Sequence, residues 1–414
     1  MRRVPLGLAG AVLLLAVALI WLGARDDETD TAAVPDLTRP ELIERGAYLA
    51  RAGNCQACHT PRGERPYSGG RGIPTPFGTI YSSNLTPDPA TGLGAWSAQD
   101  FRRALHHGRS RDGRLLYPAF PYDAYTQIRT ADADALWAYL RSLKAVNRPN
   151  RPHALRFPYD RQVALRVWRA LYFRPGRFAA QTQQSAEWNR GAYLVQALGH
   201  CGACHAERNA WGASPDSAAL GGGLMPMQNW YAPPLGGAQA ESLARLLRQG
   251  VSDNAALLGP MAEVVLHSTQ RLSEADLLAM GRYLQSLPRP AGPAVSGQRP
   301  SALRMERGLK LYETHCARCH GDEGRGVAGA YVALAGNPAV LEEPPANLVQ
   351  VVLGGAFAPS TAGNPRPFGM PPFAVELSDE DIAAVLSYIR NAWGNQAATV
   401  QPLDVQRWRG SVRP

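Results

Sequence analysis

All six cysteines of the chain occur in three pairs with identical spacing, and a histidine follows each pair at once. The pairs are Cys55 with Cys58, Cys201 with Cys204, and Cys316 with Cys319, and the histidines are His59, His205 and His320. Because every cysteine belongs to such a motif, none is left for a framework of structural disulfides. The folded chain must therefore present the same small arrangement of groups three times.

The Cys-x-x-Cys-His pattern is typical of covalent attachment of a c-type haem. Two thiols three positions apart lie on one turn of helix, so both can add to the vinyl groups of one porphyrin. The histidine that follows can then bind the iron. A zinc site needs its cysteine pairs close together, but these pairs lie 146 and 115 residues apart. A redox dithiol needs a βαβ setting, which this chain lacks. The sequence therefore predicts three covalently bound haems c.

Each motif stands inside a repeated helical frame. A short amphipathic helix leads into it, and a helix with apolar groups at spacings of three and four closes the segment. The expected closing helices run from Thr130 to Leu143, from Ser273 to Leu287 and from Ser378 to Trp393. This repetition predicts an all-α fold with three tandem domains of about 100 residues each.

Composition and spacing give the boundaries of these domains. A proline-rich stretch without apolar periodicity, Pro288 to Pro300, is typical of an extended spacer. We expect an N-terminal anchor or signal at 1–30, domains at 36–143, 183–288 and 301–396, a basic linker helix at 144–182, a second linker at 289–300 and a tail at 397–414.

A second axial ligand completes each iron site in an electron carrier, and methionine is the usual choice in cytochromes c. Met370 and Met261 occupy the same position in the repeat, shortly before the third and second closing helices. In the first domain Phe120 stands in that position, and phenylalanine cannot bind iron. The first haem then either takes His106 or His107 as its second ligand or keeps an open site. Either outcome gives it a potential different from the other two.

The N-terminus indicates export. Arg2 and Arg3 precede an uncharged stretch from Val4 to Ala24, and acidic residues follow it. Positive charge before an apolar segment keeps the short N-terminus in the cytoplasm. About 20 apolar residues can span a bilayer, so a retained anchor is favoured over a cleaved signal peptide. We expect the chain at the periplasmic face of the inner membrane.

The formal charge of +9 fits an anionic lipid surface or an acidic protein partner, and no nucleic-acid motif accompanies it. Nine basic residues and one acid occur between Lys144 and Arg177, around an aromatic helical stretch from Val163 to Phe173. This segment is either a helix that bridges two domains or a docking surface for lipid headgroups or an acidic partner.

Three groups of residues resemble a known family. They are the run from Pro76 to Asp88 with Thr91 to Trp96, the run from Gly259 to Val265, and Met370 to Phe373 with Asn391 to Asn395. Over about residues 40 to 396 the chain resembles the triple-haem cytochrome c subunits of bacterial membrane-bound dehydrogenases. That resemblance implies class I-like cytochrome c domains and a catalytic partner subunit of the quinoprotein, flavoprotein or molybdopterin type. It also implies ubiquinone or a terminal oxidase as electron acceptor.

No dinucleotide fingerprint and no nucleophile motif occurs in the sequence, so we expect no catalytic residues and no substrate chemistry of its own. Two other functions stay open. One is the haem-carrying subunit of a terminal oxidase. The other is a peroxidase-like enzyme that works at the first haem, which lacks a methionine.

Overall fold

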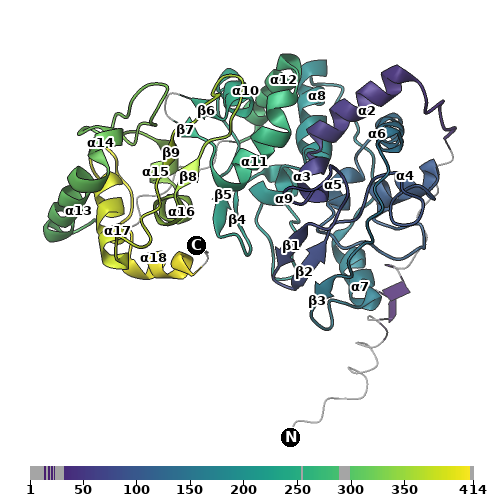
Figure 1. The fold of residues 1–414 in the computed structure, drawn as a ribbon, viewed down its shortest axis with the longest axis horizontal. Helices are drawn as coiled ribbons and strands as arrows, with labels where there is room; N and C mark the ends of the chain where they lie inside the picture. The colour runs from purple at the N-terminus through teal and green to yellow at the C-terminus, as the bar shows by residue number, and fades with distance from the viewer. Residues whose placement is uncertain are drawn as a thin grey trace, which may run out of the picture. The chain divides into compact units, whose positions relative to one another are not determined.

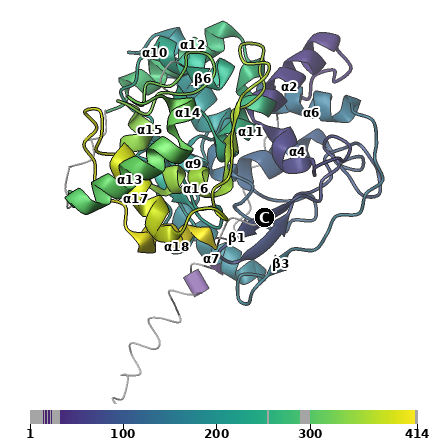
Figure 2. The ribbon, with the colours of Figure 1, turned by 60° about the vertical axis from the view of Figure 1, so that its left-hand side comes forward.

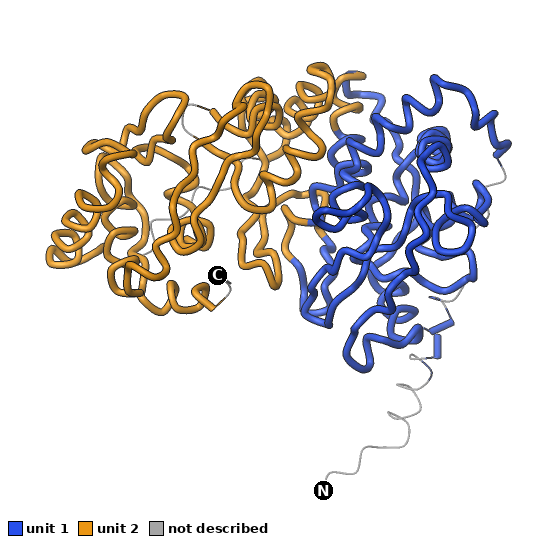
Figure 3. The backbone as a smooth tube through the Cα atoms, viewed as in Figure 1, with its two compact units in different colours: residues 1–185, 192–203, 208–215 blue, residues 186–191, 204–207, 216–414 orange. Residues whose placement is uncertain are grey.

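The structure is a computed structural model that describes residues 14, 17, 18, 20, 21 and 23 and residues 32–252, 255–288 and 299–410. Most of the expected anchor from Val4 to Ala24 lies outside the described residues. Within the described part, no helix is both long and apolar enough to cross a bilayer. The chain forms two compact units, one of residues 1–185, 192–203 and 208–215, the other of 186–191, 204–207 and 216–414 (Figure 3).

The first unit is built around three helices, α2 (Pro40–Ala52), α4 (Ala98–His107) and α6 (Thr130–Ser142) (Figure 1). α2 packs along α6, and α4 packs on the same helix. The rings of Phe101 on α4 and Trp137 on α6 stack with their centroids 5.1 Å apart. The predicted closing helix of the first domain is thus present, and it ends one residue earlier than expected. The short helices α3 (Cys55–His59) and α5 (Tyr122–Tyr125) complete the segment.

The basic linker folds onto this first unit. Its strand β3 (Ala154–Leu155) joins β1 (Gly72–Thr75) and β2 (Gly78–Tyr81) in an antiparallel sheet of order β1-β2-β3. Its helix α7 (Gln162–Tyr172) lies within one residue of the predicted helical stretch. Trp168 Nε1 of α7 donates to the backbone oxygen of Trp211, 3.0 Å away. The linker therefore contacts residues of both the first expected domain and the second.

The second unit holds the remaining helices. α8 (Ala186–Tyr193), which begins in this unit, runs on into a π-helical turn (Leu194–Leu198) of the first unit. Helices α10 (Ala240–Gln249), α11 (Gly259–His267), α12 (Glu274–Ser286), α13 (Ala302–His315), α15 (Pro338–Leu341), α16 (Ala346–Gly354), α17 (Asp379–Ile389) and α18 (Pro402–Arg409) follow. Two 3-10 turns lie at Ser217–Ala219 and Thr269–Arg271. The second and third cysteine motifs end on α9 (Gly202–His205), whose residues are divided between the two units, and on α14 (Ala317–His320) of the second unit.

Short strand pairs occur between these helices. β4 (Gly223–Met225) pairs with β5 (Trp230–Ala232), β6 (Val251–Ser252) with β7 (Ala255–Ala256), and β8 (Ala356–Phe357) with β9 (Gly369–Met370), all antiparallel. The all-α prediction is right for the framework, but it did not include these strands. Strands of two to four residues are too short to show the alternation by which a sequence indicates a strand.

The same crossing of leading and closing helix occurs three times, and a glycine makes it possible. A Cβ added to Gly46 would lie 1.8 Å from the carbonyl oxygen of Ala135. The corresponding distances are 1.9 Å from Gly191 to Ala279 and 2.4 Å from Gly308 to Ala384. A side chain of any size would force the two helices apart at these points. In the third segment α13 crosses α17 in this way (Figure 1, Figure 2).

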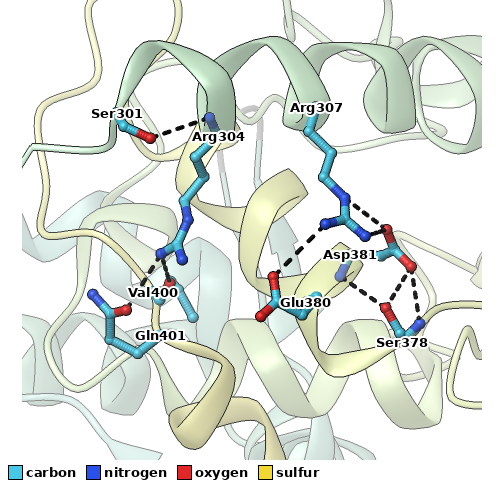
Figure 4. Close-up of polar contacts among 8 residues, drawn as sticks. All are labelled: Ser301, Arg304, Arg307, Ser378, Glu380, Asp381, Val400 and Gln401. Carbon is cyan, nitrogen blue, oxygen red and sulfur yellow. Dashed lines mark hydrogen bonds and ion pairs between the residues drawn. The ribbon is translucent and has the colours of Figure 1, made fainter.

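An ion pair stands beside each glycine. The arginine that precedes the glycine reaches an aspartate near the start of the closing helix. The distances from the arginine Nε to the carboxylate oxygen are 2.9 Å for Arg45 and Asp132, 2.8 Å for Arg190 and Asp276, and 3.1 Å for Arg307 and Asp381. Asp381 also accepts from the Ser378 hydroxyl in a capping box at the start of α17 (Figure 4). Each leading helix is thus held against its closing helix 9 to 11 residues before the cysteine motif.

Candidate haem-attachment sites

Each cysteine motif lies on a single helical turn. The first fills α3, while Cys201 and Cys316 immediately precede α9 and α14, on which their partner cysteines lie. On such a turn residues i and i+3 are neighbours, so the two thiols of each pair face the same side. The cysteines are half-buried or exposed, and none of the six forms a disulfide. Six thiols in this arrangement fit three thioether-bound porphyrins.

Each of the three motif histidines makes a hydrogen bond to a backbone carbonyl, and this bond determines which ring nitrogen can bind a metal. His59 Nδ1 lies 2.7 Å from the carbonyl oxygen of Ser83, His205 Nδ1 lies 2.6 Å from that of Pro233, and His320 Nδ1 lies 3.1 Å from that of Val332. Because a carbonyl oxygen only accepts, each Nδ1 must carry the proton. Nε2 therefore has the free lone pair that can bind a metal. Most metal-binding histidines are arranged in this way, with the other ring nitrogen donating a hydrogen bond to the protein.

The surroundings also keep these imidazoles neutral, which ligation requires. Burial lowers the pKa of His59, His205 and His320, although the carbonyl bond of each opposes the shift. The first thiols of the first and third motifs also lie in apolar surroundings. Burial raises the pKa of Cys55 to about 12 and that of Cys316 to about 11, and the second thiol of each pair adds to the shift. An apolar setting with one neutral nitrogen donor fits a haem in each motif.

The two predicted methionine ligands lie in different local structures. Met370 ends β9 and is half-buried. It packs against the core of the third segment, and Cys316 packs against the same core. Met261 lies in the first turn of α11, which precedes the closing helix α12. Met370 is thus brought to the core that carries its motif, and the ligand role of both residues stays a prediction.

The first segment has aromatic and histidine side chains where a methionine is missing. The ring of Phe120 lies 5.3 Å from that of Tyr125. His106 and His107 are both buried near the end of α4. Arg177 donates to His106 Nδ1 at 2.5 Å, so the ring proton of a neutral His106 sits on Nε2. That tautomer offers iron no lone pair, which leaves His107 or an open site for the first haem.

Sequence reasoning missed two tyrosines beside the first motif. Tyr67 and Tyr125 are 3% and 7% exposed. Burial raises the pKa of both, and the Cys55 thiol contributes in each case, so both phenols lie close to the first cysteine pair. Their spacing in the sequence does not reveal this proximity, since they stand 12 and 70 residues after Cys55. Only their burial beside the motif indicates it, and that burial is seen only in the folded chain.

Four histidines lie outside the motifs and α4, and three of them have ordinary structural positions. His153 Nδ1 accepts from the backbone nitrogen of Tyr81 at 3.2 Å. His315 lies 3.4 Å from a carboxylate oxygen of Glu376. His267 ends α11. The fourth, His200, instead contacts Tyr125 of the first segment.

Comparison with known proteins agrees with this geometry. The sequence matches the cytochrome c family over residues 43–144 and 305–393, which include the first and third motifs. It is 36% identical to the cytochrome c subunit of the quinone alcohol dehydrogenase of Gluconobacter oxydans, over 98% of this chain and 88% of that protein. It is 37% identical to the gluconate 2-dehydrogenase cytochrome c subunit of Pantoea cypripedii, over 91% and 92% of the two chains.

A third relative is larger. The chain is 38% identical to one of the subunits of the nicotinate dehydrogenase of Pseudomonas putida over 93% of its own length, but only 33% of that protein is covered. The first two of these relatives match over most of both chains, and both are cytochrome c subunits of dehydrogenases. The chain therefore belongs to the family of cytochrome c subunits of alcohol and gluconate dehydrogenases.

Proposed function

We propose that this protein is a membrane-attached, periplasmic cytochrome that carries three haems c and passes electrons from a partner dehydrogenase to ubiquinone or a terminal oxidase. The observation that carries the proposal is the bond from Nδ1 to a carbonyl in all three motifs. Three separate loops supply these carbonyls, and each leaves Nε2 available to iron. Haem c supplies one-electron exchange when it is bound.

The roles of the chain's own residues follow from that arrangement. Cys55, Cys58 and their counterparts hold the porphyrin, and the motif histidine binds the iron in a fixed orientation. Met370 and Met261 are the second ligands for the third and second sites, where a thioether raises the reduction potential. Without a methionine the first site has a different potential, so the three haems differ in the ease with which they accept an electron.

An exposed surface on the linker supports membrane attachment. Phe157, Val163 and Leu171 are 77%, 49% and 45% exposed, and exposed arginines stand among them at positions 156, 161 and 174. Gly23, the last described residue of the N-terminal apolar stretch, lies against α7, since a Cβ on it would fall 1.8 Å from the Arg166 carbonyl oxygen. Apolar and basic side chains beside such a segment suit an anionic lipid surface.

The haem content tests the proposal directly. The full chain is produced in a host that attaches haem c, and its intact mass and pyridine haemochrome are measured. We expect three haems per chain, and replacement of both cysteines in one motif by serine should remove one haem only. A count below three in the unaltered chain contradicts the proposal.

The partner is tested separately in solubilised membranes. A tagged full chain should co-purify with a catalytic dehydrogenase subunit and accept its electrons. Co-purification with an integral-membrane oxidase and no dehydrogenase would instead favour the oxidase-subunit alternative. Peroxide turnover by the isolated subunit would favour the peroxidase alternative.

A further inference from the structure

The backbone before the first cysteine motif lies directly against the backbone before the second. A Cβ placed on Gly53, two residues before Cys55, would lie 3.3 Å from Cys55 Sγ and 3.5 Å from the carbonyl oxygen of Leu198. A Cβ placed on Gly199 would lie 3.4 Å from Cys201 Sγ. All of these residues belong to the first unit. The first cysteines of the two motifs, Cys55 and Cys201, are therefore both preceded by backbone that is in contact within the first unit.

Two aromatic rings cross this junction. The phenol of Tyr125 donates to the carbonyl oxygen of Gly53 at 3.3 Å. The same phenol oxygen lies 3.5 Å from Nδ1 of His200, the residue just before Cys201. The two rings meet edge to face with centroids 5.4 Å apart, an arrangement favourable for aromatic pairs. A chain of contacts thus runs from Gly53, two residues before Cys55, through Tyr125 and His200 to the backbone at Cys201.

The side-chain contacts of His200 are specific to this junction. Its φ of +39° lies in the left-handed region, which Asn54 at the same position before the first motif also adopts, with a φ of +50°. The carbonyl oxygen of Leu198, 3.0 Å from Nδ1, holds the ring in place. His315 occupies the same position before the third motif, but it ends a regular helix and contacts Glu376 and Phe373 of its own segment.

We propose that Tyr125 and His200 form the contact through which the first and second haems exchange electrons. The proposal rests on the proposed function, because it requires a haem in each of the two motifs. Electronic coupling falls steeply with the distance across which an electron must tunnel, and bonded or touching atoms maintain it better than gaps. One electron passes from a reduced haem to an oxidised one, and no bond or proton changes at either ring. Tyr125 and His200 are therefore positioning residues.

The test measures the rate of electron exchange inside the full-length holoprotein. Flash reduction loads one electron, and the two haems are followed by their different spectra, since the first lacks a methionine ligand. Equilibrium potentials are measured in parallel by spectroelectrochemistry. We expect His200→Ala and Tyr125→Leu each to slow exchange between these haems by about an order of magnitude. Tyr125→Phe keeps the ring and should slow it less.

His315→Ala is the matched control and should leave this exchange unchanged. If Tyr125→Leu fails to retain its haems, His200→Ala decides, because His200 is only half-buried. Three haems per chain, with unchanged exchange rates and potentials in His200→Ala, would overturn the role of the bridge and leave the proposed function intact. Fewer than three haems in the unaltered chain would instead contradict the proposed function itself.

Discussion

Gly308 in α13 lies so close to Ala384 in α17 that a Cβ on the glycine would fall 2.4 Å from the alanine's carbonyl oxygen. Both helices are packed around the core of the third segment, so neither can move away without opening that core. The close crossing of the two helices therefore requires a glycine at this position. Its replacement should lower the stability of the whole third segment.

Gly308→Ala should destabilise the third segment by about 2–4 kcal/mol, because the added methyl group forces the helices apart. Gly410→Ala is the matched control, since nothing lies within 4 Å of a Cβ at that position, and it should change stability by no more than about 0.5 kcal/mol. Urea unfolding of the full holoprotein, followed by tryptophan fluorescence and haem absorbance, measures both. Equal stability of the two variants would contradict the account of the crossing.

Met370 and Met261 should each set the potential of a different haem. Met370→Ala and Met261→Ala remove a thioether ligand, so each should lower one potential and leave the other two in place. Met227 is 58% exposed, and Met227→Ala should leave all three potentials unchanged. Spectroelectrochemical titration gives the potentials, and the sulfur-to-iron absorption band gives the ligation. If Met261→Ala leaves every potential unchanged, the second site has another ligand.

Local features of the site were predictable from the sequence, whereas long-range ones were not. The cysteine motifs and the closing helices depend on residues within a few positions of one another. The carbonyl partners of the motif histidines come 24, 28 and 12 residues later. Because the three loops differ in length, no common spacing indicates Ser83, Pro233 or Val332.

The repeated helical frame around each cysteine motif can be found in the sequence, but the contacts that hold each frame together cannot. The Arg-Gly pair of each leading helix stands out in the sequence at Arg45, Arg190 and Arg307. Only the folded chain shows that each arginine pairs with an aspartate of the closing helix and that each glycine permits close contact. The contact of Tyr125 with His200 joins residues 75 positions apart. Tertiary packing alone creates it.

The three Arg–Asp pairs should differ in strength because they differ in burial. The Asp132 side chain is 1% exposed and also accepts from the Tyr193 hydroxyl at 2.6 Å. Asp381 is 23% exposed. Asp132→Asn should therefore cost about 2–3 kcal/mol, because it weakens two bonds of a buried carboxylate. Asp381→Asn should cost about 1 kcal/mol or less, as for a solvent-screened pair. Denaturant unfolding that gives equal losses would contradict this ranking.

Glu342 should make the stability of the second unit depend on pH. Burial raises the pKa of its carboxyl to about 7, although the amide of Asn347 and the charge of Arg390 oppose the shift. Asn347 also exchanges hydrogen bonds with the backbone of Tyr231, which lies on β5. Between the ordinary value of 4.5 and about 7 the folded state binds more protons than the unfolded state. Stability must therefore fall as pH rises through this window, and the loss is complete above it.

Glu342→Gln removes the ionisation but keeps an oxygen that can accept from Asn347. The variant should gain on the order of 1–2 kcal/mol over the unaltered protein between pH 5 and pH 8. Glu323→Gln, at a side chain that is 69% exposed, is the matched control and should follow the unaltered protein at every pH. Thermal unfolding by circular dichroism across this range provides the comparison. If the stability of Glu342→Gln and that of the unaltered protein depend on pH in the same way, the Glu342 carboxyl ionises in the folded chain without cost. Burial between β5 and α16 would then not raise its pKa.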